Sequence, residues 1–296
     1  YLAMKEKNRQ RRLRLVAEAK KKPAVFTVYI ILRLIVVAIL VSSILRGEYE
    51  NAAICLLVLF LFLLPLFVQK NFGIELPGTL EIIILVFIFA SEILGELGCF
   101  FINVPNWDSI LHTTTGFLCA ALGFALIDIL NRNDKIKFQL SPIYVALVAF
   151  CFSMTIGVLW EFFEFGMDWF FHTDMQRDTV INAIYSASLD PTRSNKVVAV
   201  KGIYDVVING EELGMGGYLD IGLIDTMKDL LVNFVGAVVF SVTGFFYARS
   251  KDTKRTPAQS FVPSKKTAEQ DYLRQARESG NSAAPEATPD ATDDKP

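Results

Sequence analysis

Carboxylates and one imidazole recur at helical spacing where long apolar runs of this sequence begin or end. The residues are Asp108, His112, Glu161, Glu164, Asp225 and Asp229. They form three pairs whose members are three or four positions apart, so on a helix each pair shares one face. Oxygen ligands with a single imidazole suit a divalent metal such as Mg²⁺, Mn²⁺ or Ca²⁺, and they also suit zinc or iron.

Carboxylates that lie close together repel one another, so they must be protonated, paired with a cation or bound to a metal. We therefore expect the six residues to hold a divalent metal, with Glu164 or His112 acting as a general base. The alternative is that the acids only end helices, face water and bind nothing. The second histidine of the chain, His172, is interpreted as a loop residue.

The elements that must position these residues are apolar runs long enough to cross a bilayer. The chain of 296 residues is 52% hydrophobic, has a mean hydropathy of +0.39 and carries a net charge of -2. A span needs about 20 apolar residues. The runs that approach or reach this length are Ala24–Leu45, Ala52–Phe67, Leu80–Phe101, Trp107–Leu130, Ile143–Phe165 and Asp229–Ala248. The sequence therefore predicts an all-α polytopic membrane protein, a six-span helical bundle that has the lipid bilayer as its partner and no nucleic acid.

Basic residues orient these runs in the membrane. Lys and Arg concentrate before the first run, in the connection around residue 135 and after the last run. Because cytoplasmic loops carry the excess of Lys and Arg, both termini are expected in the cytoplasm. The predicted domains are a basic N-terminal segment (1-23), a membrane domain (24-248) and a disordered cytoplasmic tail (249-296), which contains a short surface helix near Thr267–Arg277.

One long connection, about 166-228, then lies on the extracytoplasmic side as a cap over the bundle. Its stretch V-V-A-V-K-G-I-Y-D-V-V-I-N-G-E-E-L alternates as a strand does and contains Asn209-Gly210, a typical two-residue hairpin turn. The sequence predicts a small β-hairpin in this cap. In this topology the six site residues lie at one membrane depth, near the outer surface.

Polar residues within the runs are expected to hold the helices together. They are Arg33, Glu92, Glu96 and Asn233. Arg33 is the one basic residue deep in a run, and its long side chain is expected to pair with Glu92. Asn233 is expected to hydrogen-bond across helices, and Gly236 to allow close helix packing.

The site motifs, in their order along the chain, resemble those of a known group of membrane proteins. They are W-D-S-I-L-H with Asp108 and His112, W-E-F-F-E with Glu161 and Glu164, and I-D-T-M-K-D-L-L-V-N-F-V-G with Asp225, Asp229, Asn233 and Gly236. The pattern resembles the VanZ-like membrane proteins and, more closely, the YjdF-type bacterial inner-membrane proteins of unknown function. VanZ-like proteins often have Gln where this chain has Glu164, and their connections are shorter than 166-228. The resemblance covers about Leu80–Tyr247. It implies a helical core in a bacterial plasma membrane, with an envelope lipid or lipid-linked precursor as a partner.

Three functions remain open at the level of the sequence. The first is a metal-dependent enzyme at the outer face, acting on lipid-linked or cell-envelope substrates by polarising a phosphoryl or acyl oxygen or by activating water. The second is a proton- or cation-coupled transporter with the acids as ion sites, although no inverted repeat or broken helix supports it. The third is a non-catalytic membrane scaffold or envelope-stress factor whose polar cluster locks the helices together.

Overall fold

The structure is a computed structural model that describes residues 22–71, 74–131, 140–250 and 260–265. The chain divides into two compact units, unit 1 (Tyr1–Cys99 with Asp252–Pro296) and unit 2 (Phe100–Lys251). The basic N-terminal segment, the expected helix near Thr267–Arg277 and most of the expected tail lie outside the described residues.

Helices long and apolar enough to cross a bilayer number five among the described residues. The spans are Pro23–Arg46 (α2), Tyr49–Gln69 (α3, Tyr49–Leu61, with α4, Leu64–Asn71), Trp107–Asp128 in α7 (Trp107–Asn131), Pro142–Phe171 (α8) and Leu223–Arg249 (α9). The expectation of a mostly helical, multi-pass membrane protein is therefore confirmed, while the expected count of six spans is not reached by this measure.

The missing span is the one expected at Leu80–Phe101, where the helix changes type along its length. The α-helix α5 (Gly78–Ile88) changes at its end into a π-helical segment, η1 (Phe89–Leu97), and a short helix α6 (Phe100–Asn103) follows. Ile88 and Phe89 both keep right-handed helical backbone angles, so the chain stays helical through the junction. The two parts have 11 and 9 residues, and neither is long enough alone.

In unit 1, helix α2 packs against α3 and α5, and α3 packs against η1. The core between these helices includes Val36, Cys55 and Val58, all fully buried. Strand β1 (Ile74–Glu75) pairs with β8 (Ser264–Lys265), a pairing that the composition of the expected tail did not predict.

The expected ion pair between Arg33 and Glu92 is wrong. Arg33 donates a hydrogen bond to the Tyr29 hydroxyl one turn earlier on the same helix, and its guanidinium lies 5.6 Å from the centre of the Tyr29 ring. Glu92 accepts a hydrogen bond of 3.3 Å from Ser91. The reason is the packing order, because Glu92 and Glu96 belong to η1, which packs on α3, whereas Arg33 belongs to α2.

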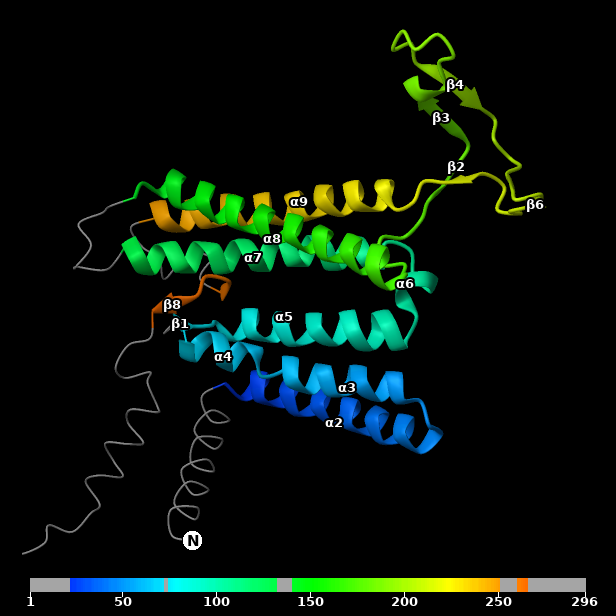
Figure 1. Ribbon diagram of the computed structural model, residues 1–296. Coiled ribbons are helices and arrows are strands. Elements are labelled where there is room, and N and C mark those ends of the chain that lie inside the picture. Colours follow the sequence, from blue (N-terminus) through cyan, green and yellow to red (C-terminus); the bar gives the residue numbers. More distant parts are fainter. Residues whose placement is uncertain (1–21, 72–73, 132–139, 251–259, 266–296) are drawn as a thin grey trace, which may run out of the picture. The chain divides into compact units, whose positions relative to one another are not determined.

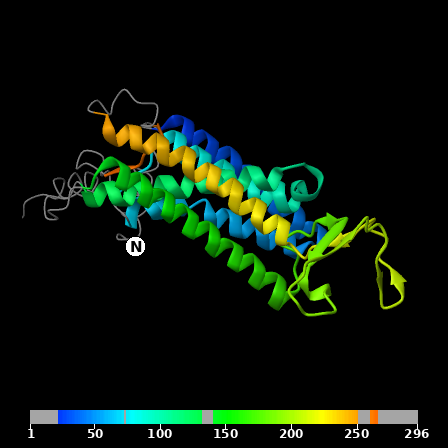
Figure 2. The ribbon, with the colours of Figure 1, turned by 90° about the horizontal axis from the view of Figure 1, so that it is seen from above.

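In unit 2, helices α7, α8 and α9 lie side by side as a three-helix bundle (Figures 1 and 2). Small residues let the backbones approach closely. A Cβ atom at Gly236 of α9 would lie 2.0 Å from the Thr113 carbonyl oxygen of α7. One at Gly116 would lie 2.1 Å from the Asn233 carbonyl oxygen. The expected role of Gly236 in close packing is therefore confirmed.

Aromatic side chains fill the bundle beyond these contacts. Phe124 and Phe240 are fully buried and meet edge to face, with ring centres 6.0 Å apart. Phe117 meets Phe240 in the same way at 5.1 Å. The half of the bundle away from the start of α7 therefore has an apolar interior.

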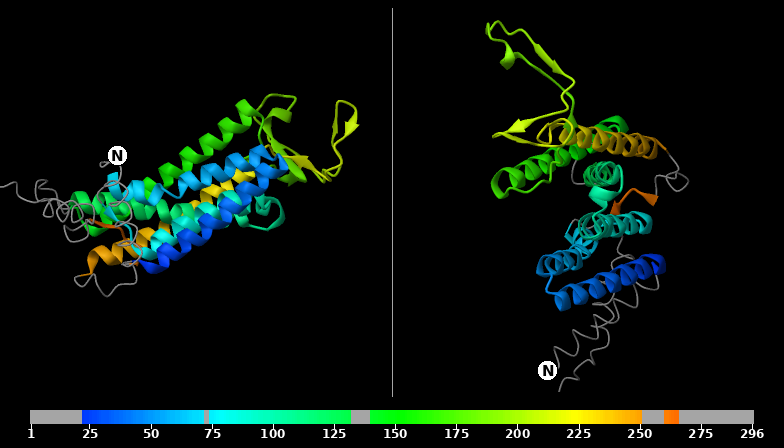
Figure 3. Two further views of the ribbon diagram at one scale, coloured as in Figure 1. Left: turned by 90° about the horizontal axis from the view of Figure 1, so that it is seen from below. Right: turned by 90° about the vertical axis from the view of Figure 1, so that its right-hand side faces the viewer.

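The connection between α8 and α9, residues 172–222, is called the cap, and the end of the bundle that carries it the cap end. Figures 1 and 3 show strands projecting from the helix ends. They form separate two-stranded antiparallel sheets: β2 (Val180–Ile181) with β7 (Tyr218–Leu219), β3 (Ala183–Ser186) with β4 (Val198–Lys201), and β5 (Val207–Ile208) with β6 (Glu211–Glu212). A short 3-10 turn, η2 (Ala187–Leu189), follows β3.

The expected hairpin is confirmed at Asn209-Gly210. Both residues have positive φ, 55° and 93°, as a type I′ turn requires, and they join β5 to β6. The preceding alternating residues do not extend this hairpin, because Val198–Lys201 pairs instead with Ala183–Ser186.

Candidate metal centre

Helices α7, α8 and α9 bring their ionisable residues to the cap end because α8 runs antiparallel to its two neighbours. His112 is five residues from the start of α7, Asp229 is six from the start of α9, and Glu161 is ten from the end of α8. At a rise of about 1.5 Å per residue these positions lie about 8, 9 and 15 Å from the helix ends. The three residues are therefore one to three turns inside the bundle.

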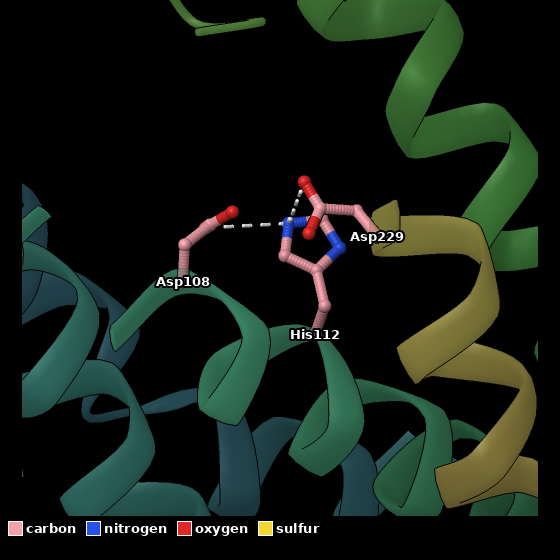
Figure 4. A group of neighbouring side chains, drawn as sticks. All are labelled: Asp108, His112 and Asp229. Carbon is pink, nitrogen blue, oxygen red and sulfur yellow. Dashed lines mark ion pairs between the residues drawn. The ribbon is translucent and has the colours of Figure 1, made fainter. Parts of the chain in front are cut away.

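The His112 imidazole lies at the middle of the cluster. Its Nε2 atom is 3.6 Å from Asp108 Oδ1 and 3.8 Å from Asp229 Oδ2, as Figure 4 shows. On the other edge of the ring, Nδ1 is 3.8 Å from Glu161 Oε1. One carboxylate from each of the three helices thus faces the same ring.

These separations are longer than hydrogen bonds, which join nitrogen and oxygen at about 2.7–3.2 Å. They match two ligands of one ion, because bonds of about 2.1 Å at angles of about 110–130° place the ligand atoms about 3.4–3.8 Å apart. The ligand atoms of Asp108, His112 and Asp229 all lie within 4.8 Å of one another. The same holds for His112, Glu161 and Glu164.

The carboxylates are withdrawn from water. The Asp229 side chain is 1% exposed and that of Glu161 is 6% exposed. Asp229 Oδ1 and Glu161 Oε2 are buried, and neither atom has a hydrogen-bond partner among the described residues, although the Gln176 and Thr226 side chains lie near enough to act on the Glu161 carboxylate. Buried acceptors are normally paired, and an unpaired buried charge is costly, so these two atoms call for a cation or a proton.

Glu164 lies beside Glu161 and is held by its own helix. The Trp160 indole Nε1 donates a hydrogen bond of 2.7 Å to Glu164 Oε1. This hydrogen bond was not expected for Trp160, although the spacing of four residues places Trp160 and Glu164 on the same helix face. The other oxygen of Glu164 keeps its lone pairs for a ligand or a proton.

Asp225 takes a different position from the one expected. It accepts a hydrogen bond of 3.0 Å from the Arg177 backbone N–H, and the positive charges of Lys228 and Arg177 act on it. It belongs to neither group whose ligand atoms all lie within 4.8 Å of one another, although its charge acts on Glu161, Glu164 and Asp229. The structure therefore brings five of the six expected residues together and leaves Asp225 at the rim.

Asp168 lies in the last turn of α8 and His172 caps that helix, and both serve the loop that follows, not the cluster of Glu161 and Glu164. The Asp168 carboxylate accepts 2.7 Å hydrogen bonds from the Met175 and Gln176 backbone N–H groups. His172 ends α8 in the left-handed conformation, at φ 57°, and is exposed. The interpretation of His172 as a loop residue agrees with this position.

Asn233 lies one turn deeper than Asp229 on α9. Its Nδ2 atom is 3.6 Å from the Met154 sulfur of α8, and its buried Oδ1 atom has no hydrogen-bond partner among the described residues. The Asn233 side chain also occupies the space that a Cβ atom at Gly157 would need. Asn233 therefore forms the floor between the cluster and the aromatic interior.

Comparison with known proteins gives one family. The family described as "Predicted membrane protein (DUF2238)" matches residues 27–250, most of the chain and all of the cluster. No curated protein and no solved structure matches the chain. The chain belongs to this DUF2238 family of membrane proteins.

Proposed function

We propose that unit 2 binds one divalent metal ion at the cap end of the bundle. The observation that carries this proposal is a histidine with three carboxylates at 3.6–3.8 Å, of which the two buried ones, Glu161 and Asp229, each have an oxygen without a partner among the described residues. A cluster that only held the helices together would have its buried oxygens satisfied by hydrogen bonds, whereas Asp229 Oδ1 and Glu161 Oε2 have none among the described residues.

In this proposal the ion lies between His112 Nε2, Asp108 and Asp229. Neutral imidazole has one free lone pair, so Nδ1 keeps its proton and turns it toward Glu161, which orients the ring as carboxylates commonly do for metal-bound histidines. One nitrogen with carboxylate oxygens suits Mn²⁺, Zn²⁺ or Mg²⁺, and Ca²⁺ with additional oxygen ligands.

Charge supports the same conclusion. Asp108, Glu161, Glu164 and Asp229 carry up to four negative charges among largely apolar helices. Lys228 is the described cation whose charge acts on His112, and its side chain is exposed. A divalent ion neutralises half of the negative charge, and a proton on Glu161 or Glu164 reduces it further.

The reaction that suits this centre is metal-assisted hydrolysis or transfer of a phosphoryl or acyl group on a lipid-linked or cell-envelope substrate. The metal supplies Lewis acidity, and Glu164 is placed to act as the general base. The location within one to three turns of the helix ends favours a substrate whose head group lies at the membrane surface.

The proposed topology keeps six spans, both termini in the cytoplasm and the cap outside a bacterial plasma membrane. The continuous helical path from Gly78 to Leu97 supports the sixth crossing. The proposed domains remain a basic segment (1-23), a membrane domain (24-248) and a cytoplasmic tail (249-296). The motif resemblance to YjdF-type and VanZ-like proteins supports the bacterial envelope.

A transporter is less well supported, because the acids of unit 2 gather at one end and Phe117, Phe124 and Phe240 fill the described interior beyond Asn233. A scaffold is disfavoured by the two unpartnered carboxylate oxygens.

Elemental analysis of the protein purified in detergent tests the proposal. Wild type loaded with Zn²⁺ or Mn²⁺ is expected to retain about one ion per chain, and Asp229→Asn to lose it. Asp225→Asn is the matched control on the same helix and is expected to retain the ion. Wild-type protein without metal after loading would refute the proposal.

A further inference from the structure

The cap has no hydrophobic core of its own. Every large apolar side chain among residues 172–222 is at least partly exposed, and the buried residues there are Asp190, Gly217 and Gly222. An isolated two-stranded sheet is marginally stable in water at best. The cap strands therefore need a surface to cover their apolar side chains.

The sheet of β3 and β4, residues 183–201, is here called the ribbon. Its exposed apolar side chains include Tyr185, Val197 and Val200, which are 62%, 62% and 42% exposed. Leu189, at the end of the turn after β3, is also exposed. Because Tyr185 pairs with Ala199 and Ile184 pairs with Val200, Tyr185 and Val197 share one face of the ribbon, and Val200 lies on the other.

The tip of the ribbon is a built loop and not a frayed end. The buried Asp190 carboxylate accepts hydrogen bonds from the Thr192 hydroxyl at 2.6 Å and from the Ser194 backbone N–H at 2.9 Å. It also accepts one from the Lys196 backbone N–H at 3.2 Å. These bonds fix the loop in which Arg193 has a left-handed backbone, at φ 53°. The basic side chain of Arg193 is therefore held at the tip.

The ribbon is basic, whereas the hairpin of β5 and β6 that follows it is acidic. It carries Arg193, Lys196 and Lys201 against the single acid Asp190, a net charge of +2. The Lys201 ammonium lies 5.7 Å from the centre of the Tyr185 ring, so a cation and an aromatic ring stand together. The next hairpin carries three acids, Asp205, Glu211 and Glu212, and no basic residue between them.

The helix that leads into the cap ends in exposed aromatic residues. Helix α8, which leads into the cap, ends with Trp169, Phe170 and Phe171, all strongly exposed. Aromatic residues of this kind mark the bilayer interface. Figures 1 and 3 show the ribbon projecting from the helix ends instead of folding back onto the bundle. The ribbon begins 12 residues after Phe171, beyond the largely polar stretch 172–179.

We propose that the ribbon lies on the membrane surface, with the face that carries Tyr185 and Val197 inserted at the interface and its basic residues on anionic lipid head groups. Apolar insertion combined with attraction to anionic lipid is the usual basis of interfacial binding. The occupant is a lipid surface and not a second protein, because the exposed aromatic end of α8 marks the bilayer interface shortly before the ribbon, and the basic charge of the ribbon suits anionic head groups. This inference does not depend on the metal centre.

The test places an environment-sensitive fluorescent amino acid at Tyr185, or at Ile208 as the control in the acidic hairpin. The full chain is reconstituted in nanodiscs of phosphatidylcholine alone or mixed with phosphatidylglycerol. We expect a blue-shifted signal at position 185, quenched by lipids with spin-labelled acyl chains, and stronger with phosphatidylglycerol. Position 208 is expected to remain water-exposed.

The charge contribution is tested with Arg193→Gln, Lys196→Gln and Lys201→Gln. Each removed charge is expected to weaken the preference for anionic lipid about fivefold, and added salt is expected to act in the same direction. An unchanged elution volume and an unchanged thermal melt show that unit 2 is intact. A probe at 185 that stays accessible to quenchers in water in both kinds of nanodisc overturns the proposal. A probe that is shielded from water but not quenched by the spin-labelled lipids also overturns it and assigns the ribbon to a protein partner.

Discussion

The substitution Asp229→Asn should have opposite effects on stability with and without metal. Asp229 and Asp108 place carboxylate oxygens within 4.8 Å of each other and of His112. At an effective dielectric constant of about 20, two charges at that distance repel by about 3.5 kcal/mol. Protonation relieves part of this repulsion, so in metal-free protein the asparagine is expected to raise stability by between about 0 and 3 kcal/mol.

In metal-saturated protein, Asp229→Asn is expected to lower the stability instead of raising it. An ion that binds only the folded state adds about 2.7 kcal/mol of stability when it is present at about 100 times its Kd. Asp229→Asn removes a ligand and so forfeits this gain. The same variant is thus at least as stable as wild type in chelator and less stable than wild type in metal.

The assay is thermal unfolding in detergent, followed by tryptophan fluorescence, with excess chelator or excess Zn²⁺. Asp225→Asn serves as the control, since Asp225 accepts a hydrogen bond from the Arg177 backbone and lies outside the ligand groups. Equal destabilisation by Asp229→Asn in both conditions would refute the reasoning, because the carboxylate would then be a structural acceptor.

Three further predictions follow from single contacts. Gly236→Ala should unfold unit 2 or separate its helices, because the new Cβ would lie 2.0 Å from a backbone oxygen. The control Gly166→Ala, whose Cβ would have nothing within 4 Å, should be neutral or slightly stabilising in a thermal melt. Trp160→Phe should keep the metal in elemental analysis and lower the turnover of any hydrolytic reaction by about tenfold, because Glu164 loses its positioning donor. The Thr192 hydroxyl and neighbouring amides hold the pKa of Asp190 below its usual range. The backbone amides of the ribbon tip should therefore exchange hydrogen slowly at mildly acidic pH and lose this protection only as the pH falls through that lowered pKa. In Asp190→Ala the protection should be lost at every pH.

The convergence of His112, Glu161 and Asp229 was predictable because it follows from two simple periodicities. Residues four apart share a helix face, and successive spans are antiparallel, so acids at alternate ends of consecutive runs meet at one level. The hairpin at Asn209-Gly210 was predictable for a similar local reason, since that pair favours positive φ at both positions.

Other features depend on packing that the sequence does not reveal. The pairing of Arg33 with Glu92 was expected because both residues lie deep in apolar runs. Helix neighbours decide which side chains meet, and Arg33 instead bonds to Tyr29 on its own helix. The change from α5 to η1 has no clear signal in residues 78–97. The position of Asp225 follows from the Arg177 backbone, a partner 48 residues away that no periodicity brings into view.

X-ray absorption spectroscopy of zinc-loaded protein tests the central claim most directly. The account predicts a first shell of one imidazole nitrogen and carboxylate oxygens at about 2.0–2.2 Å, absent from the His112→Ala variant. A sulfur contribution at about 2.3 Å, or a first shell that survives in His112→Ala, would contradict it and place the ion elsewhere.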